Sequence, residues 1–130
     1  MNYRFPKEEK LKSRKCIEQL FKEGNSVSKF PLKLIYVQVE LPEKVPMQVG
    51  VSVTKRRFKK AVTRNRIKRL MREAYRLHKN DVFNTISTSY ACMFLYIGKQ
   101  EPSFEEIEAS MVKLLQKFIV KVQNDTISNA

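Results

Sequence analysis

The sequence has no apolar run near the ~20 residues that span a bilayer. Its N-terminus, MNYRFPKEEKLKSRK, lacks the apolar centre of a secretory signal. Its two cysteines, Cys16 and Cys92, lie far apart without a CxxC motif, and His78 is the only histidine. These absences argue against a membrane span, a disulfide scaffold and a zinc site. We therefore expect a cytoplasmic protein with reduced, partly buried thiols.

Acidic residues are scarce in one part of the chain. The 130 residues include 26 Lys and Arg against 13 Asp and Glu, a formal net charge of +13. Residues 55–79 hold twelve of the basic residues and one acid, Glu73, which gives this segment a net charge of +11. The other 105 residues hold 14 basic and 12 acidic groups, a net charge of +2. Charge concentrated in one segment is typical of a polyanion-binding site.

Helical and strand patterns alternate along the chain, and they fit one domain over residues 1–130 with flexible ends at about 1–10 and 123–130. Pro42 and Pro46 mark a turn, and Ser103 with Glu106 forms an N-cap signature. The predicted elements are a helix over 13–23, strands over 33–41 and 48–54, a helix from about Lys59, a strand over 90–97 and a helix from Ser103 through Val122.

The resulting order, αββαβα, predicts an α+β fold, a two-layer α–β sandwich. We expect the strands over 33–41 and 48–54 to pair as a hairpin. The almost wholly apolar run over 90–97 is expected to be a buried central strand. The residues of the last helix expected to face inward are Ile107, Met111, Leu114, Leu115 and Phe118.

The basic helix has two faces of opposite character. At about 100° per residue, one apolar stripe contains Ile67, Leu70, Met71, Ala74, Leu77 and His78. The opposite side contains Asn65, Lys68, Arg69, Arg72, Arg76 and Lys79, and Arg64 and Arg66 flank the two stripes. If the apolar stripe docks on a sheet, the cationic side faces outward, where like charges repel by a few tenths of a kcal/mol per pair.

A dense anion would relieve this repulsion. Arginine forks bind phosphate oxygens in pairs and stack on bases, so the arginine bias favours a nucleic acid over a basic face that is merely solvated. An apolar hairpin precedes the basic helix where a helix-turn-helix protein would need a short helix, and no heptads follow as in a bZIP protein. Both observations argue against these two classes of DNA-binding protein.

No catalytic site can be assembled from protein side chains. His78 lies at the edge of the apolar stripe, where a packed or partly exposed imidazole is expected more often than a general base. Neighbouring acids such as Glu105 and Glu106 are adjacent in sequence and so face different directions. A metal-dependent nuclease would need several convergent carboxylates. We expect no catalytic residue and no metal site in the protein.

Residues 49–76, VGVSVTKRRFKKAVTRNRIKRLMREAYR, resemble the signature of the bacterial ribonuclease P protein component. The core of the signature is Arg64, Asn65 and Arg66, followed by IKRL and Arg72. The resemblance covers roughly residues 10–120. It implies a ribosomal-protein-like RNA-binding fold with a mixed sheet, in which the central βαβ crossover is left-handed, against the usual rule.

The resemblance also implies a function. The protein would be the subunit of ribonuclease P that assists a catalytic RNA in removing the 5′ leader from precursor tRNA, with Mg²⁺ held mainly by the RNA. Its partners would be the catalytic RNA and precursor tRNA, with one protein monomer per RNA, and neither DNA nor a membrane. The alternative is a structural RNA-binding protein, such as a ribosomal protein of similar topology, without a link to catalysis.

Two binding surfaces follow residue by residue from the resemblance. The catalytic RNA would contact Lys60, Arg64, Asn65, Arg66, Lys68, Arg69, Arg72 and Arg76. The leader would lie in a cleft between the first helix and the sheet and contact Ile17, Phe21, Tyr36, Ser52, Lys55, Arg56 and Lys99. Ile17 stands where many relatives have Phe, and Ile35 where a relative has Tyr.

The leader assignments leave two questions open. On the first predicted strand, Ile35 lies on one face and Tyr36 on the other, and the sequence does not identify the face that lines the cleft. Phe21 and Tyr36 also suit a core, which is the commoner place for aromatic residues at these spacings.

Overall fold

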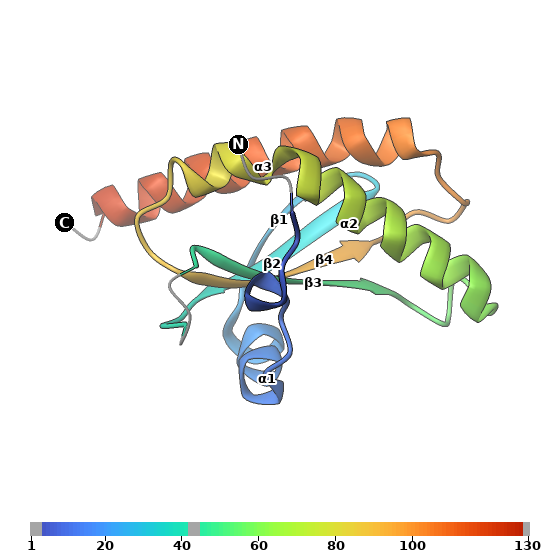
Figure 1. Cartoon of the computed structure of the whole chain (residues 1–130), viewed down its shortest axis with the longest axis horizontal. Coiled ribbons are helices and arrows are strands. Elements are labelled where there is room, and N and C mark those ends of the chain that lie inside the picture. Colours follow the sequence, from blue (N-terminus) through green and yellow to red (C-terminus); the bar gives the residue numbers. More distant parts are fainter. Residues whose placement is uncertain (1–3, 42–44, 129–130) are drawn as a thin grey trace.

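A four-stranded mixed sheet separates one short helix from two long ones in the computed structural model, which describes residues 4–41 and 45–128 (Figure 1). The strand order is β1-β2-β4-β3. The helices α2 and α3 cover one face and α1 lies on the other (Figure 1). After a short 3-10 helix, η1 (Lys7–Glu9), the elements are α1 (Arg14–Glu23), β1 (Asn25–Lys29), β2 (Leu32–Gln38), β3 (Met47–Val53), α2 (Ala61–Phe83), β4 (Tyr90–Tyr96) and α3 (Phe104–Ser128). The predicted α+β class is confirmed.

Strands β2 and β3 do not pair with each other, so the predicted hairpin is wrong. Strand β4 lies between them, antiparallel to β2 and parallel to β3. The almost wholly apolar β4 is buried along nearly its whole length, as a central strand requires. The parallel β3–α2–β4 unit expected from the resemblance is therefore present. Part of the predicted turn between the strands, residues 42–44, lies outside the described residues.

The sequence interpretation missed β1, which follows α1 directly and pairs antiparallel with β2. Its sequence is NSVSK, with Val27 as the only apolar residue. A strand signal needs alternating or β-branched apolar residues, and one valine does not supply it. Strand β1 forms because its neighbour β2 offers an unpaired edge, which is a property of the sheet and not of the segment.

The core lies between the sheet and the two long helices. The rings of Tyr36 and Phe118 meet edge to face at 4.9 Å, and those of Tyr90 and Phe118 at 5.4 Å. The five residues of α3 expected to face inward are all buried. Helix α3 continues past Val122 to Ser128, so the predicted flexible end is helical over its first part.

The N-terminal segment packs against α2 and β3. The ring of Phe5 meets the buried ring of Tyr75 edge to face at 5.6 Å. The amide of Leu11 donates a hydrogen bond of 3.1 Å to the carbonyl of Val49, so the segment runs beside the outer edge of β3. Residues 4–10, part of the end expected to be flexible, are thus packed against the domain in this structure.

The same segment covers one cation of α2 that was expected to face outward. Lys79 is 0% exposed, and its Nζ lies 2.5 Å from Oε1 of the buried Glu9. The ammonium also donates to the carbonyl of Arg4. The placement of Lys79 on the outward face is corrected, because the segment that buries it lies 70 residues away in the sequence.

Candidate nucleic-acid interface

Helix α2 docks on the sheet through the predicted apolar stripe. Ile67, Met71 and Ala74 are fully buried, and Leu70 packs against the core from a half-buried position. The cations on the other side reach solvent. Of the residues predicted to bind the catalytic RNA, Lys60, Asn65, Arg66, Arg69 and Arg72 are exposed, and Arg64, Lys68 and Arg76 are half-buried. The two faces were thus correctly predicted, apart from Lys79.

Two arginines at the start of α2 are fixed by backbone carbonyls. Arg64 donates from Nη1 to the carbonyls of Phe58 and Lys59, both at 2.8 Å. Arg66 donates to the carbonyl of Pro102 at 3.3 Å, and its guanidinium lies 3.5 Å from Glu101. The bonds of Arg64 hold the loop before the helix. Because both guanidinium groups are already held in place, binding of a partner would require little further ordering of these side chains.

Farther along the helix, an ion pair also forms on the exposed side. Arg76 pairs with Glu73, one turn earlier, at 2.5 Å. The hydrogen bond from Arg76 lowers the pKa of the Glu73 carboxyl below its ordinary value. Within the described residues, Arg69 and Arg72 form no ion pair with a carboxylate, so their positive charges remain available to an external anion.

The opposite face of the sheet carries α1, and the contact is close. Leu20 is fully buried beneath the helix. A Cβ added to Gly24 would lie 2.2 Å from the carbonyl oxygen of Leu20 and 2.8 Å from Cγ2 of Ile35, so only glycine fits there. Ile35 is therefore on the α1 face of β2, which answers the question left open by the sequence.

This geometry corrects the assignment of Tyr36 as a leader-binding residue. Its side chain is 2% exposed and lies on the other face, against Phe118 of α3. A strand held between the sheet and α1 cannot reach that ring, so the core interpretation is right for Tyr36. The opposite holds for Phe21 of α1, whose side chain is 57% exposed. Ile17 is half-buried on the same helix.

Three further leader candidates belong to β3 and the residues after it. Ser52 pairs with Leu95, which in turn pairs with Lys33, so these three residues form one row across the α1 face. Ser52 and Lys33 are half-buried, whereas Lys55 and Arg56 are exposed just beyond the strand. The structure thus brings a polar row of the sheet and two cations to the end of β3.

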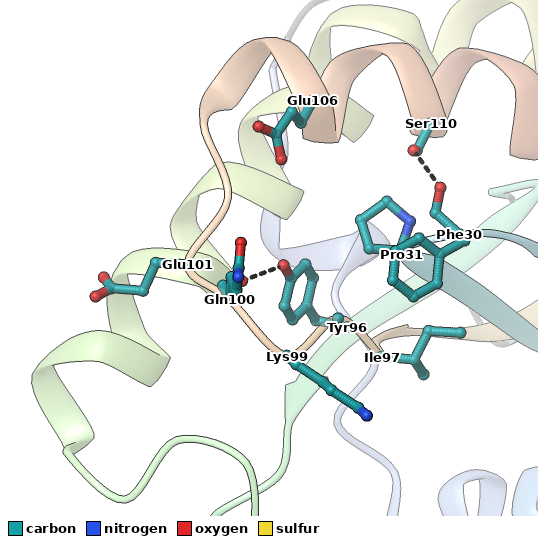
Figure 2. Close-up of a pocket in the computed structure, with 10 residues that line it drawn as sticks. Phe30, Pro31, Tyr96, Ile97, Lys99, Gln100, Glu101, Glu106 and Ser110 are labelled. Carbon is teal, nitrogen blue, oxygen red and sulfur yellow. Dashed lines mark hydrogen bonds between the residues drawn. The ribbon is translucent and has the colours of Figure 1, made fainter.

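Lys99 lies beside a pocket of about 500 Å³ at the end of β4 (Figure 2). The pocket lies between the turn at Phe30 and Pro31 and the first turns of α3 (Figure 2). The hydroxyl of Tyr96 donates to the carbonyl of Gln100 at 2.5 Å and shapes the loop that carries Lys99.

The sequence interpretation missed two residues at this end of the sheet. Arg57 donates to the carbonyl of Ile97 at 2.5 Å, so it ties the loop after β3 to the loop after β4. The run KRRFKK shows that cations are concentrated here, but it does not show which of them bonds within the protein. Phe30 is 70% exposed, and nothing in the sequence distinguishes it from a core aromatic.

Two side chains with possible catalytic chemistry, those of Cys92 and His78, take part in packing. Burial raises the pKa of the Cys92 thiol far above its ordinary value, so it is not a nucleophile. His78 is half-buried, with Nε2 3.0 Å from Glu108 of α3. Over residues 4–41 and 45–128, no three His, Cys, Asp or Glu side chains come together as metal ligands. The helices of the same ranges include none with the length and apolarity to cross a membrane.

The fold and the arginine face define a small α+β domain whose exposed helix suits a polyanion. The sequence model of the family described as Ribonuclease P matches residues 5–119. The ribonuclease P protein component of Porphyromonas gingivalis is 35% identical over 95% of this chain and 92% of its own, and that of Chlorobaculum tepidum is 34% identical over 88% and 82%. The chain therefore belongs to the family of bacterial ribonuclease P protein components, as the signature at residues 49–76 indicated.

Solved structures agree on the fold. The ribonuclease P protein of Staphylococcus aureus superposes with a TM-score of 0.66 at 23% identity and covers 83% of this chain and 93% of its own. The ribonuclease P protein from Thermotoga maritima superposes with a TM-score of 0.66 at 22% identity. The match covers 84% of this chain and 96% of that protein. Family membership makes this chain a protein subunit of a ribonucleoprotein endoribonuclease that processes tRNA, and it removes the alternative of a structural protein without a link to catalysis.

Proposed function

We propose that the exposed side of α2 binds the catalytic RNA of ribonuclease P, while the α1 face of the sheet holds the 5′ leader of precursor tRNA. The observation that carries the proposal is the acid-poor arginine surface, in which Arg69 and Arg72 project without an ion pair among the described residues. Arginine contacts to phosphate are charge-assisted and bidentate, which suits the backbone of a folded RNA.

The leader assignment rests on the pairing of a stacking surface with cations. Exposed aromatic rings stack on bases of single strands, and neighbouring cations follow the phosphates. Phe21 supplies a ring that folding leaves 57% exposed, and Ser52, Lys55, Arg56 and Lys99 supply polar and cationic groups. Ile17 adds an apolar surface without a ring.

In this proposal the chemistry belongs to the RNA. Mg²⁺ would be held mainly by the RNA subunit and would supply the activation of water there. The protein contributes fixed positive charges where the RNA alone would need more Mg²⁺. One protein monomer would bind one catalytic RNA in the cytoplasm.

The first test is reconstitution with the catalytic RNA of the same organism. We expect the protein alone to leave precursor tRNA intact at every Mg²⁺ concentration, and the protein added to the RNA to raise cleavage strongly at low Mg²⁺. Product sizes on a gel give the readout. Cleavage of precursor tRNA by RNA-free protein would refute the assignment of the chemistry to the RNA.

The second test separates the two surfaces. Arg69→Ala should weaken binding of the catalytic RNA by roughly 1–3 kcal/mol, since it removes a charge-assisted contact. Arg66→Ala should weaken binding less, because the guanidinium of Arg66 already bonds to Pro102 and lies beside Glu101.

For the leader surface, Phe21→Ala should leave catalytic-RNA binding unchanged and weaken precursor tRNA by roughly 1–3 kcal/mol, the value of one stacked base. Mature tRNA, which has no leader, is the control substrate. Equal losses for both tRNAs, in a variant with an unchanged melting temperature, would remove Phe21 from the leader surface.

A further inference from the structure

A second group of cations lies at the edge of the sheet formed by β1. The strand order places β1 and β3 at opposite edges, and α3 packs over β1 whereas α2 packs over β3. Between β1 and α3 lies a groove of about 650 Å³. Its lining includes Val27 and Lys29 of β1 and Lys113, Lys117, Val120 and Lys121 of α3.

The groove is positively charged without any acid of its own. The two segments that line it, residues 27–29 and 113–124, contain these four lysines and no Asp or Glu. Lys113, Lys117 and Lys121 follow each other at intervals of four, so they share one side of α3 and repel each other. The helix dipole favours cations only in the last turn, so it does not explain Lys113, Lys117 or Lys121.

One of these lysines is fixed at the groove. Lys117 donates from Nζ to the carbonyl of Ser28 at 3.0 Å, which ties α3 to β1. Val120, one turn from it, is 56% exposed. The repulsion of the ammonium groups lowers stability, and the half-exposed valine gains little from folding, so folding alone does not account for the arrangement. A bound polyanion would neutralise the lysines and cover the valine.

We propose that this groove binds the phosphate backbone of an RNA strand and gives the protein a second RNA-contact surface at the opposite edge of the sheet from α2. The inference rests on the proposed function, in which an RNA of the enzyme or its substrate supplies the strand. A second copy of this chain would bring four more lysines to the groove and be repelled. Lysines contact phosphates as point charges, so this surface positions RNA without reading its sequence.

The first experiment removes charge from the groove without breaking its anchor. The variant Lys113→Gln, Lys121→Gln keeps Lys117 and its bond to Ser28. If both lysines contact phosphates, the slope of log affinity against log salt should fall by about 2, so the affinity lost between about 50 and 200 mM salt shrinks by about tenfold. Titrations use catalytic RNA and precursor tRNA separately, which identifies the RNA that supplies the strand.

The control is the variant Lys7→Gln, Lys12→Gln, which removes the same charge from two exposed positions of the N-terminal segment. Lys113→Arg, Lys121→Arg should restore the parent slope. If neither RNA shows a change for the groove variant, or if the control changes the slope as much, the groove is not an RNA site and the proposal is overturned.

The second experiment places a benzophenone side chain at Val120 and irradiates the protein with each labelled RNA. Val62 on α2, 82% exposed, reports the proposed catalytic-RNA surface, and the exposed Ala109 near the acidic start of α3 should remain silent. We expect cross-links from positions 62 and 120. A cross-link from 62 alone overturns the groove and keeps the proposed function. The absence of both overturns the proposed function, and the groove with it.

Discussion

Two parts of α2 treat positive charge differently. In the middle of the helix Arg69 and Arg72 are exposed and form no ion pair within the described residues, whereas near its C-terminal end Lys79 is fully buried against Glu9 at 2.5 Å. A buried charge must be paired within the protein, because its desolvation costs several kcal/mol. An exposed charge need not be. The comparison shows that folding must pair the charge that it buries, whereas the exposed charges of Arg69 and Arg72 are left for a partner.

The largest expected effect concerns the buried end. Lys79→Ala leaves the carboxylate of Glu9 buried without its ammonium, so the free energy of unfolding should fall by about 3–5 kcal/mol. Urea denaturation followed by circular dichroism measures the loss. The matched double variant Lys79→Met, Glu9→Leu removes both charges and should recover most of the stability.

If Lys79→Ala is as stable as the parent, the pair does not anchor the N-terminal segment. The middle of α2 and its C-terminal end would then differ less than the structure indicates. The affinity of folded Lys79→Ala for the catalytic RNA should stay close to that of the parent. Lys79 faces the protein, so a large loss of affinity would also contradict the comparison.

A smaller effect is expected from anions that bind the exposed middle of α2. An anion that binds only the folded protein stabilises it by about 2.7 kcal/mol at a hundred times its dissociation constant. Millimolar sulfate should therefore raise the melting temperature by several degrees, beyond chloride at equal ionic strength. The double variant Arg69→Ala, Arg72→Ala should begin more stable and gain less, because fewer like charges oppose its folding.

Chloride at matched ionic strength is needed because screening alone stabilises a basic protein. Equal gains from the two salts would mean that general screening explains the effect. In that case the exposed middle of α2 would be a solvated basic face and not an organised phosphate site. The sequence also allowed that alternative.

The parts of the fold that depend on local periodicity were predictable from the sequence. Ile67, Met71 and Ala74 repeat at helical spacing and are buried as expected. The same reasoning failed where a distant segment decides. Lys79 has the spacing of an outward residue, but the N-terminal segment covers it. Likewise, no pattern in β2 or β3 excludes a hairpin between them, although the apolar run of β4 correctly predicted a buried central strand.

The candidate site was predictable to a similar degree. Alternation along β2 separates Ile35 from Tyr36, but only the contact of Gly24 with Ile35 shows which face meets α1. The cations of α2 were found by their density. Which of them are held internally was not visible, because the partners of Arg64 and Arg66 are backbone carbonyls, and every residue has one.

The smallest effect is expected at Glu73, which lies between Arg72 and Lys79 on α2 and is the only acid in residues 55–79. Its ion pair with Arg76 is partly exposed, so Glu73→Gln should lower stability by at most about 0.5 kcal/mol at neutral pH. Because the pair lowers the pKa of Glu73 in the folded state, its contribution is present above the unfolded pKa. That contribution disappears as the pH falls through the folded pKa, so parent and variant should converge in acid.

The same substitution should affect RNA binding in the opposite direction. Without the carboxylate, Arg76 is released to the exposed surface and the local net charge rises by one. The affinity for catalytic RNA should increase slightly, and the salt slope should steepen by up to about one. Salt-dependent titration of folded Glu73→Gln measures both. Weaker binding would mean that Glu73 holds Arg76 in the geometry that the RNA requires, so that an acid within the cationic surface is part of the site.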